Sequence, residues 1–223
     1  MFVPDHYRVD DGERVRRVVR ENPLCQLVSN GPWRPLITHL LCIDPEPGPE
    51  LVGTTLLAHL NRANPHWGAL ADGDPATLVF CGPHGYVSPT VYDITPAAPT
   101  WDFITVHVHG TVHPIEAGDP TLEVILETVR ICEERFGTGW DPGPSMEYLR
   151  RILPGVGAFG FRVQSVDGHF KLSQELTQDV RDRLVDSFRR SPSTLLHGLV
   201  DHMGAAGLVR GADQAASVSA GER

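Results

Sequence analysis

The most constraining feature of this chain is a succession of short apolar runs separated by clusters of Gly, Pro, Asn and Asp. The runs LCQLVS, LITHLLCI, LVGTTLLAHL and TLVFCG occupy residues 24–29, 36–43, 51–60 and 77–82. Turn clusters such as NGPW at 30–33 and DPEPGPE at 44–50 lie between them. Runs of this length with such punctuation predict β-strands that follow one another closely.

A longer strand is predicted at 100–115, with the sequence TWDFITVHVHGTVHPI. Its residues alternate in character, which places Val106 and Val108 on one face and His107 and His109 on the other. This alternation is typical of a strand that has a buried face and a more polar face.

Later segments contain both strand and helix signals. Residues 158–172 predict a strand, a turn near Asp167-Gly168 and a second short strand. Asp10 and Asp11 can cap a predicted helix that runs to about Glu21, and Asn64 and Pro65 are typical of the cap and the first residue of a short helix. Further helices are predicted for 119–136, 145–153, 177–189 and 194–202. In the 119–136 helix, the predicted apolar face consists of Leu122, Ile125, Leu126, Val129 and Cys132.

Closely spaced strands with most helices near the ends predict an α+β protein built on an antiparallel β-barrel with peripheral helices. We expect one domain at 1–204. The remainder, 205–223, is small and polar, which predicts a disordered tail.

The formal net charge of the 223 residues is −9. Binding to nucleic acid through phosphates requires a basic face, so this balance argues against a nucleic-acid partner. No apolar run approaches the roughly 20 residues that span a bilayer, and the N-terminal segment MFVPDHYRVDDGERVRR has no apolar stretch. We therefore expect a cytoplasmic protein without a membrane partner.

The four cysteines are widely spaced and form no Cys-x-x-Cys pair. Cys25, Cys42 and Cys81 lie in apolar strand-like runs, where a thiol usually behaves as a small buried apolar group. A disulfide, a catalytic thiol or a thiolate-bound metal is the less favoured interpretation.

The segment from Gly155 to Gly160 matches the G-x-G-x-x-G pattern of dinucleotide-binding proteins. That pattern binds a pyrophosphate only where it follows a strand and opens a helix. Here it follows a predicted helix and leads into a predicted strand. We interpret the glycines as helix-to-strand turn residues.

The eleven histidines are the unusual feature of the composition. The pair His107 and His109 indicates either a polar stripe on a barrel wall or part of a metal site. His59 ends an apolar strand, where its imidazole either projects into a cavity as a metal ligand or orders the turn that follows. We expect the remaining turn and terminal histidines, His6, His169, His197 and His202, to lie on the surface.

Five phrases, in order along the chain, resemble the PaiB-like family of FMN-binding split barrels. They are MFVPDHYRV at the start, HLNRANPHW at 59–67, GPHGYVSP at 82–89, PTWDFITVHVHG at 99–110 and FKLSQ at 170–174. The resemblance implies a split β-barrel that forms a homodimer with its cofactor at the subunit interface. Many family members are described as FMN-binding negative transcriptional regulators.

Within that superfamily the chain is similar to the piperazate synthases. The phrases that carry this similarity are TLLAHLNRANPHW, SPTVYDITPAAPTW and RILPGVGAF. The similarity implies haem b rather than flavin, and cyclisation of N5-hydroxy-L-ornithine to L-piperazic acid with formation of an N–N bond. An FMN-binding oxidoreductase and a transcriptional regulator stay open as alternatives. Glu175 stands where many regulators have Asn, so a flavin contact there is not carried over.

The resemblance implies roles for ten residues. His59 is the implied axial ligand of the haem iron. The implied cofactor-binding residues are His59, Asn61, Arg62, Trp67, Lys171, Ser173 and Gln174, and the candidate acids and bases are Tyr92, His107 and His109. Each has a structural alternative: turn or interface stabilisation for the cations and amides, a polar stripe for the histidines and barrel packing for the tyrosine.

Overall fold

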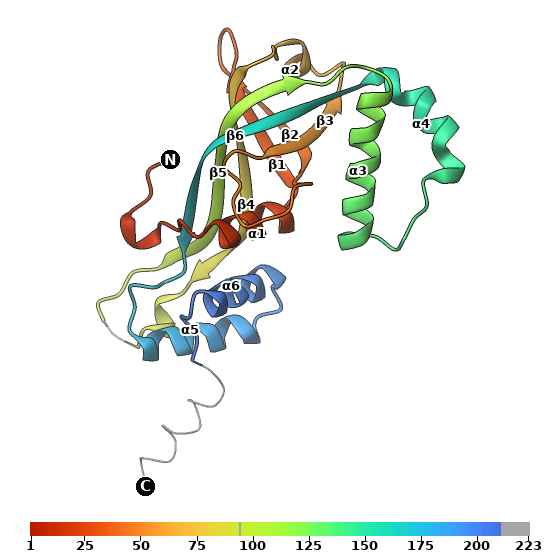
Figure 1. The fold of residues 1–223 in the computed structure, drawn as a ribbon. Helices are drawn as coiled ribbons and strands as arrows, with labels where there is room; N and C mark the ends of the chain where they lie inside the picture. Colours follow the sequence, from red (N-terminus) through yellow and green to blue (C-terminus); the bar gives the residue numbers. More distant parts are fainter. Residues whose placement is uncertain (94, 211–223) are drawn as a thin grey trace. The chain divides into compact units, whose positions relative to one another are not determined.

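The computed structural model describes residues 1–93 and 95–210, and six of its strands form a closed antiparallel barrel in the order β1-β2-β3-β6-β5-β4 (Figure 1). The strands are β1 (Leu24–Asn30), β2 (Pro35–Ile43), β3 (Thr55–Asn61), β4 (Asp74–Val87), β5 (Thr100–Pro114) and β6 (Val156–Lys171). The predicted α+β class with an antiparallel barrel and peripheral helices is confirmed.

The helices occupy the segments between and after the strands. They are α1 (Gly12–Glu21), α2 (Pro65–Gly68), α3 (Asp119–Phe136), α4 (Met146–Ile152), α5 (Gln178–Arg190) and α6 (Thr194–Ala205), with short 3-10 turns η1 (Asp5–Tyr7), η2 (Pro89–Val91), η3 (Gly143–Ser145) and η4 (Leu153–Gly155). Two predicted caps are confirmed, because the Asp11 side chain accepts from Arg14 N and Asn64 Oδ1 accepts from His66 N.

The described residues divide into two compact units. Unit 1 contains Met1, 10–81 and 105–168, and unit 2 contains 2–9, 82–104 and the chain from His169 onward. Each of the three longest strands, β4, β5 and β6, contributes residues to both units.

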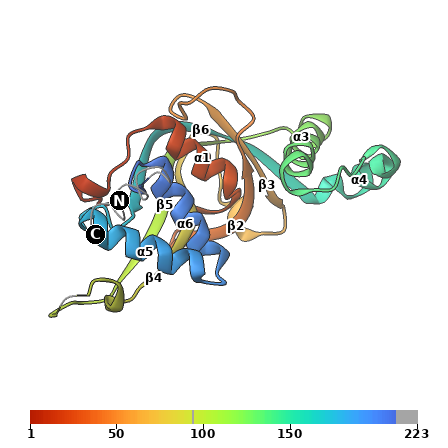
Figure 2. The ribbon, with the colours of Figure 1, turned by 90° about the horizontal axis from the view of Figure 1, so that it is seen from below.

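Unit 1 has an apolar barrel interior produced by the alternation of its strands. Leu56 and Ala58 of β3, Leu78 of β4, and Val106 and Val108 of β5 are fully enclosed. α3 lies against β3, and α3 and α4 lie beside each other (Figure 2). Along β5, enclosed residues such as Val106 and Val108 alternate with half-buried ones such as His107 and His109, which confirms the predicted two faces of this strand.

The α3 helix faces the barrel with a different side from the predicted one. Leu122 is buried as expected, but the other apolar residue in the buried set is Val124, with Thr121 and Thr128 beside it. Ile125 and Leu126 are half-buried. Thr128 tolerates this orientation because its hydroxyl donates to Val124 O at 2.8 Å.

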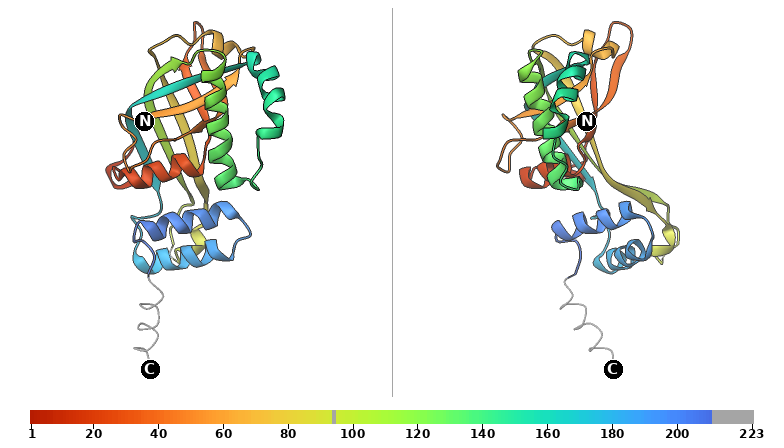
Figure 3. Two further views of the ribbon diagram at one scale, coloured as in Figure 1. Left: turned by 45° about the vertical axis from the view of Figure 1, so that its right-hand side comes forward. Right: turned by 90° about the vertical axis from the view of Figure 1, so that its right-hand side faces the viewer.

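Unit 2 contains α5 and α6, which pack side by side (Figure 3). Leu184, Leu199 and Met203 from these helices are fully enclosed, as are Phe170 and Leu172. His202 is also buried, with its ring 6.0 Å from that of Phe170, so the expectation that His202 lies on the surface is wrong.

The predicted turn at Asp167-Gly168 is wrong, because β6 continues through both residues to Lys171. Asp167 does not close a turn with its carboxylate. Instead the carboxylate accepts from the Met1 amine at 2.7 Å and lies 3.4 Å from His109 Nε2. These cross-strand partners favour an extended backbone.

A buried ion pair anchors α1 to the segment after β2. Arg16 and Asp44 are 2% and 0% exposed at their side chains, and the guanidinium donates to both carboxylate oxygens at 2.6 and 2.5 Å. Further donors of Arg16 reach the carbonyl oxygens of Glu46, Pro47 and Glu50. Because the charges are paired and the donors occupied, this burial is tolerated.

The cysteines in the described part of the chain are free. Cys25 and Cys42 are buried as predicted, and burial raises the pKa of the Cys42 thiol. Cys81 is exposed, so the prediction of burial is wrong for this residue. Its position falls on the outward face of β4, between the enclosed residues Phe80 and Gly82.

No helix among the described residues is both long and apolar enough for a membrane crossing. The predicted tail at 205–223 lies outside the described residues from 211 onward. Before that point, Leu208 O accepts from Gln178, and Arg210 pairs with Asp179 and Asp182 of α5.

Candidate functional site

His59 occupies the outward face of β3 in unit 1. Its neighbours Ala58 and Leu60 point into the barrel interior, and the backbone of His59 pairs with Ala158 of β6. The alternation of the strand therefore holds the imidazole half-buried on the outside of the barrel wall.

The electrostatic state of His59 suits a metal ligand. Burial lowers the pKa of its imidazole, which favours the neutral form. Of the two ring nitrogens, Nδ1 is enclosed without a hydrogen-bond partner among the described residues. Because Nδ1 is enclosed, a ligand would have to approach the other ring nitrogen, Nε2.

The turn after His59 is built from its own side chains. Asn61 Oδ1 accepts from Ala63 N at 2.8 Å, and the Arg62 guanidinium lies 5.6 Å from the centre of the Trp67 ring. The indole covers Gly157, where an added Cβ would lie 2.5 Å from Trp67 Cδ2. Gly157 therefore serves close packing of α2 against β6, which supports our rejection of a dinucleotide fingerprint. The prediction of turn glycines is wrong for Gly157 and Gly160, because both lie within β6.

His66 fixes this turn to the barrel, and we did not single it out from the sequence. Its ring is buried, with Nε2 2.8 Å from Ser29 Oγ on β1 and Nδ1 2.9 Å from Thr38 Oγ1 on β2. Burial lowers its pKa. Because both ring nitrogens are occupied by hydroxyls, His66 is a structural residue and not a free ligand.

The predicted acid–base pair on β5 is half-buried, and the two rings are 6.2 Å apart. His109 Nδ1 lies 2.9 Å from Thr77 Oγ1, and its Nε2 faces Asp167. Both nitrogens of His109 therefore have partners. His107 lies on the same face of the strand.

In unit 2, the predicted cofactor-binding residues after β6 form a tight turn. The side-chain amide of Gln174 makes two local hydrogen bonds. Its Oε1 accepts from Leu172 N and its Nε2 donates to Phe170 O, both at 2.7 Å. Lys171 Nζ donates to Thr100 Oγ1 and to Trp101 O. These contacts favour a turn-stabilising role for Gln174 and leave Lys171 as the cation of the turn.

Asp102 lies behind this turn and was missed in the sequence. It is completely buried, and its Oδ2 accepts from Ser173 Oγ at 2.7 Å. Burial raises the pKa of its carboxyl to about 6, against the opposing effect of Ser173 and Lys171. The strand alternation could have revealed it, because Asp102 shares the buried face with Ile104 and Val106.

Tyr92 is also nearly buried, at 8% exposure. Arg183 of α5 holds its backbone by donating to Val91 O at 2.8 Å and to Tyr92 O at 2.9 Å. Burial, followed by the charges of Asp102 and Glu175, raises the pKa of its hydroxyl. Tyr92 therefore keeps its proton at neutral pH, and the raised pKa makes its hydroxyl a weaker acid.

His169 lies in the same unit and is not the surface residue we expected. Its ring is half-buried, 5.6 Å from Tyr7 and 4.7 Å from Phe103. Its Nε2 is enclosed without a hydrogen-bond partner in the described part of the chain, and burial lowers its pKa.

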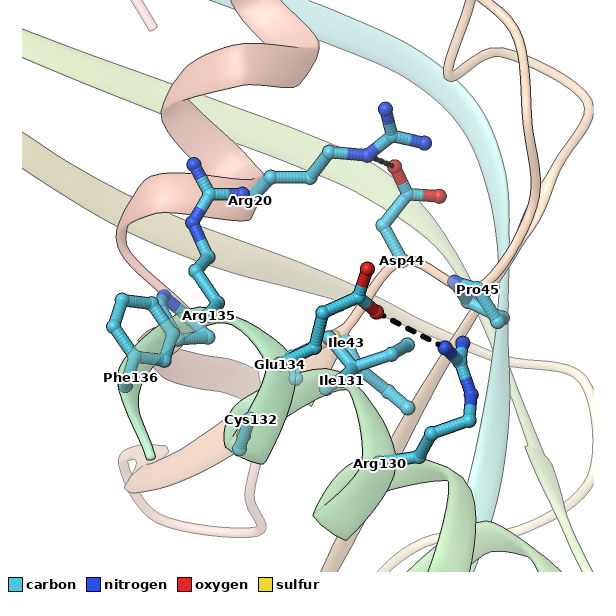
Figure 4. Close-up of a pocket in the computed structure, with 12 residues that line it drawn as sticks. Arg20, Ile43, Asp44, Pro45, Arg130, Ile131, Cys132, Glu134, Arg135 and Phe136 are labelled. Atoms are coloured by element: carbon cyan, nitrogen blue, oxygen red, sulfur yellow. Dashed lines mark hydrogen bonds and ion pairs between the residues drawn. The ribbon is translucent and has the colours of Figure 1, made fainter. Parts of the chain in front are cut away.

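A pocket of about 440 Å³ lies elsewhere in unit 1, between the end of α1, the end of β2 and α3 (Figure 4). Its charged groups are already paired, with Arg20 Nε 2.7 Å from Asp44 Oδ2 and Arg130 3.1 Å from Glu134. It includes none of the ten predicted site residues. We therefore do not assign the cofactor to it.

Comparison of the sequence with a family model assigns the chain to a family. Residues 1–165 match the family model described as "Putative FMN-binding domain". The chain belongs to this FMN-binding family. The chain is also similar to the "Protease synthase and sporulation protein PAI 2" of Bacillus subtilis, which is 26% identical over 78% of this chain and 82% of its own length.

Solved structures of the FMN-binding split-barrel type share the fold of this chain. The FAD and heme binding protein from Mycobacterium smegmatis aligns with a TM-score of 0.52 and 17% identity over 74% of this chain and 73% of that one. The flavocytochrome Anf3 from Azotobacter vinelandii gives 0.54 and 15% over 75% and 72%. At these identities the likeness establishes the split-barrel fold, and the choice of cofactor needs a separate argument.

Proposed function

We propose that the chain is a haem-dependent piperazate synthase, which converts N5-hydroxy-L-ornithine to L-piperazic acid. The proposal combines the family membership with the synthase-like phrases of the sequence, TLLAHLNRANPHW, SPTVYDITPAAPTW and RILPGVGAF. The names of two solved relatives with this fold, a FAD and heme binding protein and a flavocytochrome, support haem as a cofactor that such a barrel can hold.

The observation that carries the proposal is His59. A half-buried imidazole whose neutral form is favoured by burial is the kind of donor that haem iron takes in many proteins, and with Nδ1 enclosed the ligating atom would be Nε2. His66, seven residues later, gives the contrast, because its two nitrogens are occupied by Ser29 and Thr38. We therefore propose that His59 would be the residue that holds the haem iron.

The reaction joins the two nitrogens of the substrate. The free amine forms a bond to N5, the N5–O bond breaks, and the oxygen leaves as water with a proton that the amine gives up. When bound, haem supplies a Lewis-acidic iron that polarises the hydroxylamine. Because the sum is redox-neutral, no nicotinamide partner is required.

The chain must also supply proton transfer and orientation. Tyr92 is the proposed acid, since its hydroxyl is protonated at neutral pH, and its raised pKa means that it would act as a weak one. His107 and His109 both stay our proposed bases, and the nitrogens of His109 face Thr77 and Asp167. The site must also hold the flexible ornithine chain in a folded form. Because the entropy of that chain is lost on binding, the barrier to the reaction itself is lower.

The acidic groups of the cofactor require cationic partners. We propose Arg62, stacked on Trp67, and Lys171 as partners of the haem carboxylates. Asn61, Ser173 and Gln174 then act by shaping the turns that carry these cations. We also propose a homodimer, as the family resemblance implies.

The deciding experiment is an absorption spectrum of the purified protein supplied with haem, followed by turnover of N5-hydroxy-L-ornithine. We expect a Soret band, no flavin fluorescence and formation of piperazic acid. His59→Ala should lose most of the haem and all turnover, whereas the control His39→Ala, at an exposed position on β2, should keep both. A normal Soret band and full turnover in His59→Ala would remove His59 from the site.

The second candidate is an FMN-binding oxidoreductase, and the family description favours it directly. Arg62 and Lys171 would suit a flavin phosphate as well as a haem carboxylate. A yellow protein that releases FMN on denaturation would put this candidate first.

A regulatory role is the third possibility, in view of the sporulation relative. The net charge of −9 opposes binding to DNA phosphates. A gel-shift assay at physiological salt should give no specific complex, and a nanomolar complex would revive this role.

A further inference from the structure

We propose that Asp102 is a positioning residue that fixes the turn at 171–174 through Ser173 and thereby sets how Lys171 meets the acidic group of a cofactor. The inference rests on the proposed function only for the identity of that cofactor. Asp102, Ser173 and Lys171 all lie in unit 2.

The first observation is the backbone of Ser173. Its φ is +53°, in the left-handed region that a residue with a Cβ seldom adopts. Such a conformation persists only where the surroundings hold it in place. Ser173 is fully buried, and its hydroxyl donates to Asp102 Oδ2 at 2.7 Å, so the carboxyl is the side chain that holds it.

The second observation is the rest of the turn. Leu176 N donates to Ser173 O at 3.1 Å, and Leu172 N donates to Gln174 Oε1 at 2.7 Å. These bonds close the turn upon itself. The bond to Asp102 and those of Lys171 to Thr100 and Trp101 tie it to β5, across about 70 residues of sequence.

The third observation is that Asp102 is poorly explained by packing. Its Oδ1 is enclosed with no hydrogen-bond partner among the described residues, an arrangement that costs stability. Ile104, next on the same face of β5, shows that an apolar residue suits this face. A carboxyl at position 102 therefore serves the turn and not the core.

The charged environment explains why the carboxyl is retained in a buried place. Lys171 from β6 favours its ionised form, whereas Glu175 from the turn opposes it. The charge of Asp102 also contributes to the raised pKa of Tyr7, from η1, and of Tyr92, which follows η2. Asp102 thus links Lys171 to the titratable groups on every side of the turn.

Hydrogen–deuterium exchange on the full chain without cofactor tests the positioning directly. In Asp102→Ala we expect the amides of 171–176 to exchange at least about tenfold faster, whereas Asp102→Asn, which still accepts from Ser173, should stay within about threefold of the wild type. The control is Val185→Ala, a buried change on α5 in the same unit. Unchanged exchange in Asp102→Ala, or an equal local increase in Val185→Ala, would overturn the proposal.

A double-mutant cycle on cofactor affinity provides the second readout. Asp102→Ala and Ser173→Ala should each weaken binding about tenfold, and the double variant should bind no worse than the weaker single variant, because both changes release the same turn. Additive losses would overturn the proposal. The cycle uses whichever of haem or FMN the wild type retains, so retention of FMN alone refutes the synthase but not the positioning. If neither is retained, the exchange experiment decides.

Discussion

The replacement Asp102→Asn should change how the stability of the protein depends on pH. Burial raises the pKa of the Asp102 carboxyl from 3.8 to about 6 in the folded chain. Because the folded pKa lies above the unfolded one, the native state retains a proton that the unfolded chain has already lost. The contribution of Asp102 to stability is therefore fully present below pH 3.8 and is lost as the pH rises through about 6.

The magnitude follows from the two pKa values. The difference between 3.8 and about 6 corresponds to roughly 3 kcal/mol, at 1.36 kcal/mol for each pKa unit. Solvent screening does not reduce it much, since Asp102 is completely buried. Asn has a similar shape and can accept from Ser173, but it does not titrate.

The assay is urea unfolding of the cofactor-free protein at several pH values between 4 and 7.5. The free energy of unfolding of the wild type, relative to Asp102→Asn, should fall by roughly 2.5 kcal/mol across this range, because part of the total is already lost at pH 4. Asp186→Asn, at an exposed position on α5, is the control and should give a flat difference. A flat or rising difference for Asp102→Asn would refute the reasoning, since it would mean that the buried carboxyl does not hold its proton.

Two further predictions concern the packing of unit 1. Arg16→Met should destabilise the protein by about 3–5 kcal/mol in urea unfolding, because it leaves the buried Asp44 without its main partner. The control Arg17→Met removes a part-exposed pair with Glu21 and should cost under about 1 kcal/mol. Equal losses in the two variants would contradict this account. Gly157→Ala should cost about 1–3 kcal/mol because its Cβ meets the Trp67 ring, and Trp67→Leu should reduce that cost in a double-mutant cycle, whereas independent effects would mean that the two positions are not coupled.

Much of the barrel could be predicted from local pattern. The period of two in the 100–115 segment separated Val106 from His107 correctly, and the capping residues Asp11 and Asn64 marked helix starts. These features depend on neighbours in sequence, so a single sequence reveals them. The same alternation placed Asp102 on the buried face, and only its charge hid the significance of that position.

Features set by distant partners could not be predicted in the same way. Asp167-Gly168 has the composition of a turn, but cross-strand contacts keep it extended. The α3 helix shows the same limit, because the barrel beside it decides which side is buried. The occupied nitrogens of His66 depend on Ser29 and Thr38, from two other strands.

The division of β4, β5 and β6 between both units has an evolutionary consequence. Unit 2 is assembled from three separate stretches of the chain, so no single crossover between related genes could transplant it intact. A crossover at Cys81 would leave only the 2–9 stretch of unit 2 parental, and one at Ile104 would make only the stretch from His169 onward foreign. Diversification of this chain is therefore expected to proceed by point substitution around Asp102 and the turn it holds, and not by shuffling of modules.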